Sequence, residues 1–471
     1  MTTLHRGQGK EITQQLNAEV KQIFAQWVGC ANVIWDCKVA EAKTAYNKYK
    51  EAVAAGLETT YPKPDQKYAH HKTQERAYLK GVPAQICRNA ASKFHEAMTA
   101  YRQGTKGFPH FKLPNPDRHC VLTRELFEVE AVEDTLVFKI KKSEKSKPFI
   151  TIVLKKPKNL VGLPKMIEIR RHYNRYFLSY SYTQNGIEVQ DEAAILKELS
   201  EASSEDQQRF IMGMDAGVKN PITLSTGTVL GFTDPEKKNL ARKLHKRKKL
   251  QRQKARQEEA AKRAKVKTIA KPKDSKNLRK TKTKIADCYA NEANIRRNMN
   301  HRVSKVIAEQ APEVKVVVCE DLKLKNLTKK PPPKQDPETK KYLPNGANAK
   351  AGLNRSLLNI GIGQILKFTA YKLKERGKLL VPINPQYSSQ ECAVCGHIAK
   401  ANRPTRDIFC CIQCGHQDDA DRNAAVVLKQ RFVKQLTTPQ VKPAKVVKKI
   451  AYRRQQAARL AVSVCGVEGD P

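Results

Sequence analysis

The chain has 471 residues, of which 40% are hydrophobic, so it is long enough to build about three domains with cores of their own. Its 89 Lys and Arg residues against 46 Asp and Glu give a formal net charge of +43, which predicts a phosphate-rich partner, namely nucleic acid. A disordered tail protein is excluded by the apolar content, and a membrane protein by the lack of any apolar run of roughly 18 residues.

The first two stretches of the chain predict helices and then strands. Between Asn17 and Met98, apolar residues recur at every third or fourth position, which is typical of helices with one buried face, and we expect Trp35 in that face rather than stacked on a base. Between Gly107 and Thr183, short segments rich in β-branched and aromatic residues predict a small barrel or sandwich with basic edges. The acidic residues 188–206 then read as a linker.

An α/β domain follows, and three of its predicted elements carry an acid at an end. One apolar strand ends on Asp215, a later one ends on Glu320, and Asp421 opens a helix-forming run. Singly, these acids have simpler explanations as a turn residue, a solvated strand end and a helix cap. Together, three carboxylates at one sheet edge favour Mg²⁺ or Mn²⁺ between them, and such ions can hydrolyse a phosphodiester.

Two Cys-x-x-Cys pairs predict a zinc ribbon just before Asp421. The pairs are Cys392 with Cys395 and Cys411 with Cys414, and a glycine follows each. Four thiolates at this spacing close a tetrahedral shell around one structural Zn²⁺ and leave no open position for catalysis. Nearby residues that could compete for the metal are Cys410, His397 and His416. The remaining cysteines are scattered and no apolar signal core occurs between Met1 and Val20, so we expect a reducing, cytoplasmic compartment.

The order of these motifs resembles the TnpB family, insertion-sequence proteins related to the type V CRISPR effectors. The matching phrases run from GMDAG through VVVCEDL, YSSQECAVCGH and CIQCGH to DADRNAA, and KGFPHFK extends the likeness to Lys106. By this resemblance Asp215, Glu320 and Asp421 are the three acids of a split RuvC nuclease. The family usually has His-Asp-Arg-Asp-x-Asn-Ala-Ala at the third acid, and here Asp418 and Ala420 replace the His and the Arg.

The resemblance implies a multidomain α/β protein with an RNase H-like RuvC nuclease domain, an inserted zinc ribbon, and an N-terminal β-barrel (wedge) that carries a helical recognition domain. The implied boundaries are 1–16 and 105–187 for the barrel, 17–104 for the helical domain, 188–207 for the linker, 208–385 for the first nuclease part with a basic helical or lid region at 235–310, 386–416 for the ribbon, 417–432 for the last nuclease part, and 433–471 for a basic tail. Residues 329–350 read as a flexible surface insertion.

The function that this resemblance implies is a transposon-associated, RNA-guided DNA endonuclease with a guide RNA and a target DNA as partners, in a prokaryotic cytosol or nucleoid. A compact type V CRISPR effector and a guided DNA-binding protein without efficient cleavage are the nearest alternatives. From charge and cysteines alone, a non-catalytic RNA-binding zinc-ribbon protein is also possible, but it leaves the three acids unexplained.

Overall fold

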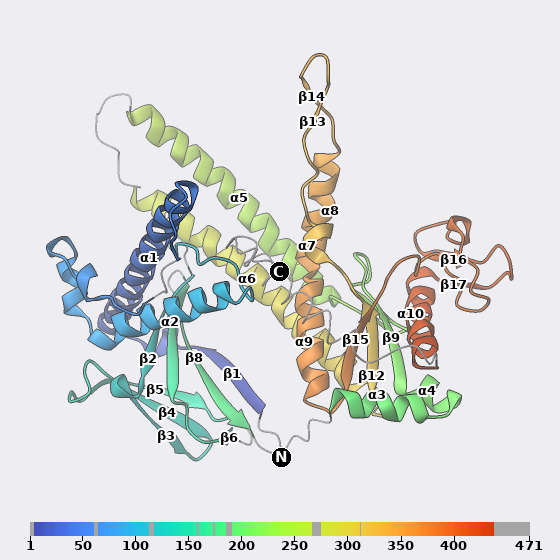
Figure 1. Ribbon diagram of the computed structural model, residues 1–471, viewed down its shortest axis with the longest axis horizontal. Helices are drawn as coiled ribbons and strands as arrows, with labels where there is room; N and C mark the ends of the chain where they lie inside the picture. Colours follow the sequence, from blue (N-terminus) through green and yellow to red (C-terminus); the bar gives the residue numbers. More distant parts are fainter. Residues whose placement is uncertain are drawn as a thin grey trace. The chain divides into compact units, whose positions relative to one another are not determined.

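The structure is a computed structural model that describes residues 4–60, 65–112, 117–157, 160–172, 175–184, 191–265, 275–310 and 312–437 (Figure 1). The chain divides into two compact units between residues 187 and 188, and each is described by itself. Most of the predicted basic tail, from residue 438 on, lies outside the described residues.

The strands of the first unit form two antiparallel sheets. The larger sheet has the order β1 (Leu4–Glu11), β8 (Arg175–Gln184), β7 (Met166–His172) and β2 (Asp117–Thr123), with β6 (Leu160–Val161) paired to β8. The smaller sheet has the order β3 (Phe127–Val132), β4 (Thr135–Lys141) and β5 (Pro148–Lys155). Along β4, Leu136, Phe138 and Ile140 point inward and alternate with more exposed residues, as a half-buried strand requires. The described strand pairs do not close into a barrel, so the predicted barrel is not confirmed.

Helices α1 (Ala18–Ala54) and α2 (Ala84–Arg102) pack on these sheets and share one core with them. The side chain of Asn17 caps α1 by accepting a hydrogen bond from the Val20 amide. Trp35 packs edge-on against Phe94 and donates to the His110 carbonyl, so it fastens the KGFPHFK segment to α1. Two short 3₁₀ turns, η2 (Ala69–His71) and η3 (Gln74–Gly81), join the two helices.

The second unit is built on a five-stranded mixed sheet with the order β11 (Val229–Leu230), β10 (Ile222–Leu224), β9 (Ile211–Asp215), β12 (Val316–Glu320) and β15 (Leu379–Ile383). Strands β9, β12 and β15 run parallel, and β10 and β11 run antiparallel to their neighbours. The two central strands are buried on both faces, which explains their uninterrupted apolar sequences.

Helices cover both faces of this sheet. Residues Met212 and Met214 of β9 pack with α6 (Lys276–Glu309) and α9 (Ile362–Lys374), while Ile211 packs on the other face with α3 (Glu192–Glu201) and α10 (Ala420–Thr437). The prediction of a linker at 188–207 is therefore wrong for its described part. The segment forms α3 and the start of α4 (Ser204–Phe210), and Ile195 and Leu199 of α3 are buried against α10 and the sheet.

The basic region after the first acid forms a helical hairpin of α5 (Asp234–Lys265) and α6. Arg247 of α5 donates to the buried Glu292 of α6 at 2.7 Å and stacks over Tyr289, so the hairpin is fixed while most of the cations of α5 stay exposed. Residues 266–274 lie outside the described part.

Farther along the chain, α7 (Leu324–Leu327) and α8 (Ala347–Ile360) flank an exposed hairpin of β13 (Lys334–Gln335) and β14 (Tyr342–Leu343), seen at the end of α8 in Figure 1. The predicted surface insertion therefore has a regular, if short, β structure. Across the described residues of the chain, none of the helices combines the length and the apolar character of a membrane span.

Candidate active site and metal centre

The parallel pairing of β9 and β12 brings two of the three predicted acids to one edge of the sheet. In the register of these strands, Met214 lies opposite Cys319, and the next residues are Asp215 and Glu320. Because the carboxyl ends of parallel strands leave a sheet at the same edge, both acids emerge there, and ligands of open α/β sheets bind at such edges.

Helix α10 supplies the third acid and can do so because β9 has a glycine at the contact. A Cβ atom on Gly213 would lie 1.9 Å from the Ala425 carbonyl oxygen, so only glycine lets the helix lie this close to the strand. Asp421 is in the first turn of the helix, and a Cβ on Gly217 would be 3.7 Å from its Oδ2. Asn220 donates to the same Oδ2 at 3.2 Å.

Asp215 is buried where the charges of both other acids act on it. Burial raises the pKa of Asp215 to about 8, with further contributions from the charges of Glu320 and Asp421. Burial also raises the pKa of Glu320, although Ser388 donates to its Oε1 at 3.1 Å. Arg403 brings a positive charge to the site, since its Nη2 lies 3.6 Å from Asp421 Oδ1.

These observations fit a site for a hard divalent cation. Burial and the neighbouring carboxylates favour the protonated form of Asp215, and a cation bound at this edge would replace that proton. Their oxygens do not all lie within 4.8 Å of one another, unlike the thiols described below, so binding would draw the acids together.

Two further acids next to Asp421 have structural roles. Asp419 Oδ1 accepts hydrogen bonds from the amides of Asp421 and Arg422, both at 3.0 Å, and so caps α10. Asp418 pairs with the Arg422 guanidinium at 3.1 Å. Asp421 remains the better candidate for the third acid, because its charge acts on the buried Asp215.

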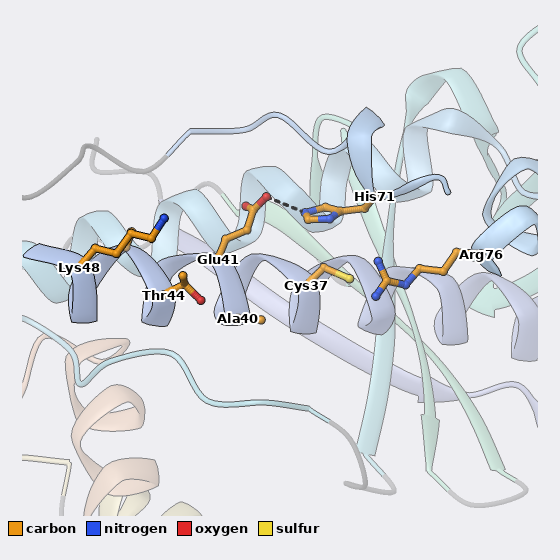
Figure 2. A pocket seen from close by; sticks show the side chains of 8 residues that line it. Cys37, Ala40, Glu41, Thr44, Lys48, His71 and Arg76 are labelled. Carbon is orange, nitrogen blue, oxygen red and sulfur yellow. Dashed lines mark ion pairs between the residues drawn. The ribbon is translucent and has the colours of Figure 1, made fainter. Parts of the chain in front are cut away.

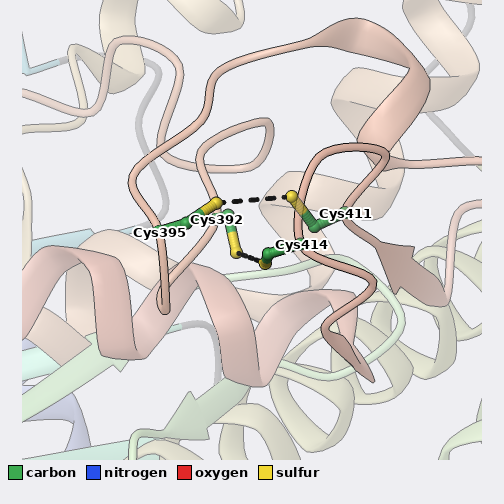
Figure 3. A group of neighbouring side chains, drawn as sticks. All are labelled: Cys392, Cys395, Cys411 and Cys414. Atoms are coloured by element: carbon green, nitrogen blue, oxygen red, sulfur yellow. Dashed lines mark hydrogen bonds between the residues drawn. The ribbon is translucent and has the colours of Figure 1, made fainter.

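The four predicted zinc ligands converge, as Figure 3 shows. The Sγ atoms of Cys392 and Cys414 are 3.6 Å apart, those of Cys395 and Cys411 are also 3.6 Å apart, and all four lie within 4.8 Å of one another. Both knuckles are built alike, since Gly396 and Gly415 have φ of 75° and 72° and each donates its amide to the carbonyl of the first cysteine of its pair. This arrangement can hold a zinc ion in a closed tetrahedral shell.

The three competing residues are not part of this cluster of thiols. Cys410 ends the strand β16 (Ile408–Cys410), where it pairs with Gln417 of β17 (Gln417–Asp419). The carbonyls of His397 and His416 accept from the first cysteine of each knuckle, at 2.9 and 2.8 Å, so these two residues shape the knuckles through their backbones.

One buried side chain ties the ribbon to the helix of the third acid. Asn423 is fully buried, accepts from the Ala393 amide at 3.0 Å and donates to the Glu391 carbonyl at 2.8 Å. Gln430, farther along α10, donates to the Ala393 carbonyl at 2.7 Å. The first zinc knuckle is therefore held directly on α10, two residues from Asp421.

Four residues that support the site were not found from the sequence: Asn220, Ser388, Arg403 and Asn423. For Asn423 the signal was present, since a polar residue inside the otherwise apolar run of a buried helix needs a hydrogen-bond partner. The other three lie in loops, where the sequence carries no periodicity that shows direction.

Comparisons with known proteins point to one group. Residues 363–428 match the family model of the Cas12f1-like TNB domain. The chain is 29% identical over 268 residues to the putative RNA-guided DNA endonuclease InsQ of Escherichia coli K12, which covers 57% of this chain and 56% of that protein. It is 32% identical over 133 residues to the CRISPR-associated endodeoxyribonuclease Cas12f1 of Sulfoacidibacillus thermotolerans, covering 28% of this chain and 26% of that one.

Among solved structures, a Cas12f1–sgRNA–target DNA complex aligns over 90% of this chain and 84% of that chain, with 15% identity and a TM-score of 0.49. The chain thus spans about half the length of one curated relative and about a quarter of the other. The resemblance to TnpB and the compact type V effectors, predicted from the motifs, is confirmed by these relatives.

Proposed function

We propose that this protein is a transposon-associated, RNA-guided DNA endonuclease of the TnpB type, which acts in a prokaryotic cytosol or nucleoid and cuts its target at a RuvC site. Asp215, Glu320 and Asp421 are its catalytic residues and hold Mg²⁺ or Mn²⁺. The zinc ribbon of Cys392, Cys395, Cys411 and Cys414 is structural. The first unit supplies a wedge and a helical recognition region, and the second an RNase H-like nuclease.

The observation that carries the proposal is the meeting of three distant acids at one sheet edge. They come from residues 215, 320 and 421, on two parallel strands and the first turn of α10. In support of this meeting, burial first and then the charges of the two other carboxylates raise the pKa of Asp215 to about 8. A fold gains no stability from such an arrangement, so we attribute it to binding of a cation.

The bound cations would activate a water and stabilise the leaving oxygen of a phosphodiester. The residues around them prepare the site. Asn220 and Ser388 hold the carboxylates of Asp421 and Glu320 by the hydrogen bonds described above, which fixes the direction of their free oxygens. Arg403 carries a positive charge within 3.6 Å of Asp421, where it can contact a non-bridging oxygen of the scissile phosphate.

Charge supports nucleic acid as the substrate and partner. The exposed cations of α5 and the net charge of +43 suit the neutralisation of phosphates, and we expect them to bind a guide RNA and the target DNA without reading sequence. Sequence would then be read by base pairing with the guide, as in other RNA-guided systems.

The test uses protein purified with its RNA and supplied with Mg²⁺ and a matched DNA target. Substituting Asp215, Glu320 or Asp421 by Ala should lower the cleavage rate by roughly 10³-fold or more, because each loses a cation ligand, while guided DNA binding persists. Asp419→Asn keeps a cap acceptor at α10 and is the matched control that should still cut. Cleavage by Asp421→Ala near the parent rate would contradict the site.

The same experiment separates the alternatives. A guide copied from a transposon end supports the TnpB type, and a guide with CRISPR repeats supports a compact type V effector. Binding of a matched target without cleavage by the parent would identify a guided binder and overturn the nuclease proposal.

A further inference from the structure

A second group of potential metal ligands lies in the first unit, far in sequence from the zinc ribbon. Helix α1 and the turn η2 border a pocket of about 450 Å³. Figure 2 shows Glu41 reaching from α1 toward the ring of His71, which comes from η2. The polar residues that line the pocket are Cys37, Glu41, Thr44, Lys48, His71 and Arg76.

Three ligand atoms meet at one end of this pocket. Glu41 Oε1 contacts the Nε2 atoms of both His70 and His71, the second at 3.2 Å. The carboxylate oxygen and the two imidazoles offer ligand atoms that all lie within 4.8 Å of one another. In a tetrahedral zinc shell with bonds of about 2.1 Å, two ligand atoms stand about 3.4 Å apart, which is close to the 3.2 Å between Glu41 Oε1 and His71 Nε2.

The orientation of His71 is unexplained by hydrogen bonding. The residue is only 7% exposed, and its Nε2 is buried without a hydrogen-bond partner although it faces the Glu41 carboxylate. A buried nitrogen of this kind costs stability unless something binds it.

Lys38 binds Glu41 away from the oxygen that meets the two imidazoles. Lys38 contacts the other oxygen of Glu41, Oε2, at 2.6 Å and Asp65 at 2.6 Å, so its charge is shared by two carboxylates. Arg76 and Lys48 line the pocket, and these cations oppose a metal ion. The Oε1 atom, which is the one that meets both imidazoles, is not the atom that Lys38 binds.

We propose that Glu41, His70 and His71 form a second zinc site, with the fourth position open to the pocket. Two imidazoles and one carboxylate are a donor set that zinc accepts in sites with an open position. The ion would clamp η2 to α1 and so fix the connection between α1 and α2. This inference is independent of the proposed nuclease function and of the ribbon.

The test is the zinc content of the full chain after dialysis against zinc-free buffer. We expect about two equivalents for the parent, about one for His71→Ala and for His70→Ala, and about two for the control His245→Ala, which removes an exposed histidine of α5. His70 is half exposed, so its variant decides the result if His71→Ala fails to fold. Parent-like zinc content in His70→Ala would overturn the proposal. So would a parent that holds only one equivalent of zinc, if Cys411→Ser removes that equivalent.

Cobalt substitution gives a second measurement that separates the two sites. Thiolate-to-cobalt charge-transfer absorption belongs to the four-cysteine ribbon, so His70→Ala should lose one equivalent of Co²⁺ while that absorption is unchanged. Loss of the thiolate absorption in His70→Ala would place the lost metal at the ribbon and contradict the second site.

Discussion

The raised pKa of Asp215 predicts that the candidate active site weakens the cation-free protein. The pKa of this acid rises from 3.8 to about 8, first because of burial and then because of Glu320 and Asp421. Between those two values the folded state binds a proton that the unfolded chain releases, so stability falls as the pH rises through this range. Asp215→Asn removes the ionisable group and keeps the shape, and it should therefore stabilise the protein without Mg²⁺.

The size of the effect follows from the width of the pH range. The range from pH 3.8 to 7 is about three pH units. At about 1.4 kcal/mol per unit, the loss of folding free energy caused by Asp215 has an upper limit of ~4 kcal/mol. Water entry and side-chain relaxation reduce such values, so we expect on the order of 2 kcal/mol at pH 7 and almost none near pH 4. For a unit of this size, about 2 kcal/mol corresponds to roughly 4–8 °C in the melting temperature of the second unit.

The assay is a thermal melt of zinc-loaded protein in Mg²⁺-free buffer between pH 5.5 and 8, with and without added Mg²⁺. Asp215→Asn should melt higher than the parent by a margin that grows with pH, and added Mg²⁺ should raise the melting temperature of the parent only. Asp287→Asn, which changes an exposed acid on α6, is the matched control and should follow the parent. A variant that melts at or below the parent temperature at pH 8 would refute the electrostatic argument.

Three other outcomes are expected. Arg403→Ala should slow cleavage by roughly 10-fold or more with target binding unchanged, whereas Arg406→Ala, in the same loop, should cut normally; equal rates for both variants would remove Arg403 from the site. Cys411→Ser should lose both the ribbon zinc and cleavage, whereas metal analysis of Cys410→Ser should show parent-like zinc content. The reverse result would mean that Cys410, and not Cys411, binds the zinc. The purified protein should carry RNA. Without that RNA, its binding to DNA should lack sequence preference, and its affinity should fall on the order of 10³-fold between about 50 and 200 mM salt. Selective cutting by RNA-free protein would point to an unguided nuclease.

The acids and the zinc knuckles could be predicted from the sequence because each depends on a local signal. Asp215 and Glu320 directly follow apolar runs that read as buried strands, and the spacing within each Cys-x-x-Cys pair fixes the geometry of a knuckle. The meeting of the three acids in space depends on the order of the strands in the sheet. The apolar runs alone do not specify that order, and the family resemblance supplied it.

The rest was hidden because its signals are weak or distant. Helix α3 buries only Ile195 and Leu199, and its many acids outweigh these two residues in any composition-based reading, so the segment looked like a linker. His71 lies in a turn some thirty residues after Glu41 of α1, and the fold brings the two side chains together. No rule of sequence spacing predicts a pair so far apart. Asn423 makes its bonds to backbone atoms, which the sequence does not distinguish.

The close packing of α10 on Gly213 has a consequence for synthesis of the protein. Strands β9 and β12 leave the ribosome long before α10, and the part of their face that α10 covers stays open until the helix arrives. Because domains fold largely from the N-terminus during translation, the third acid and the ribbon are the last parts of the site to be delivered. A nascent or truncated chain that ends before residue 420 therefore carries two of the three candidate acids and lacks the third.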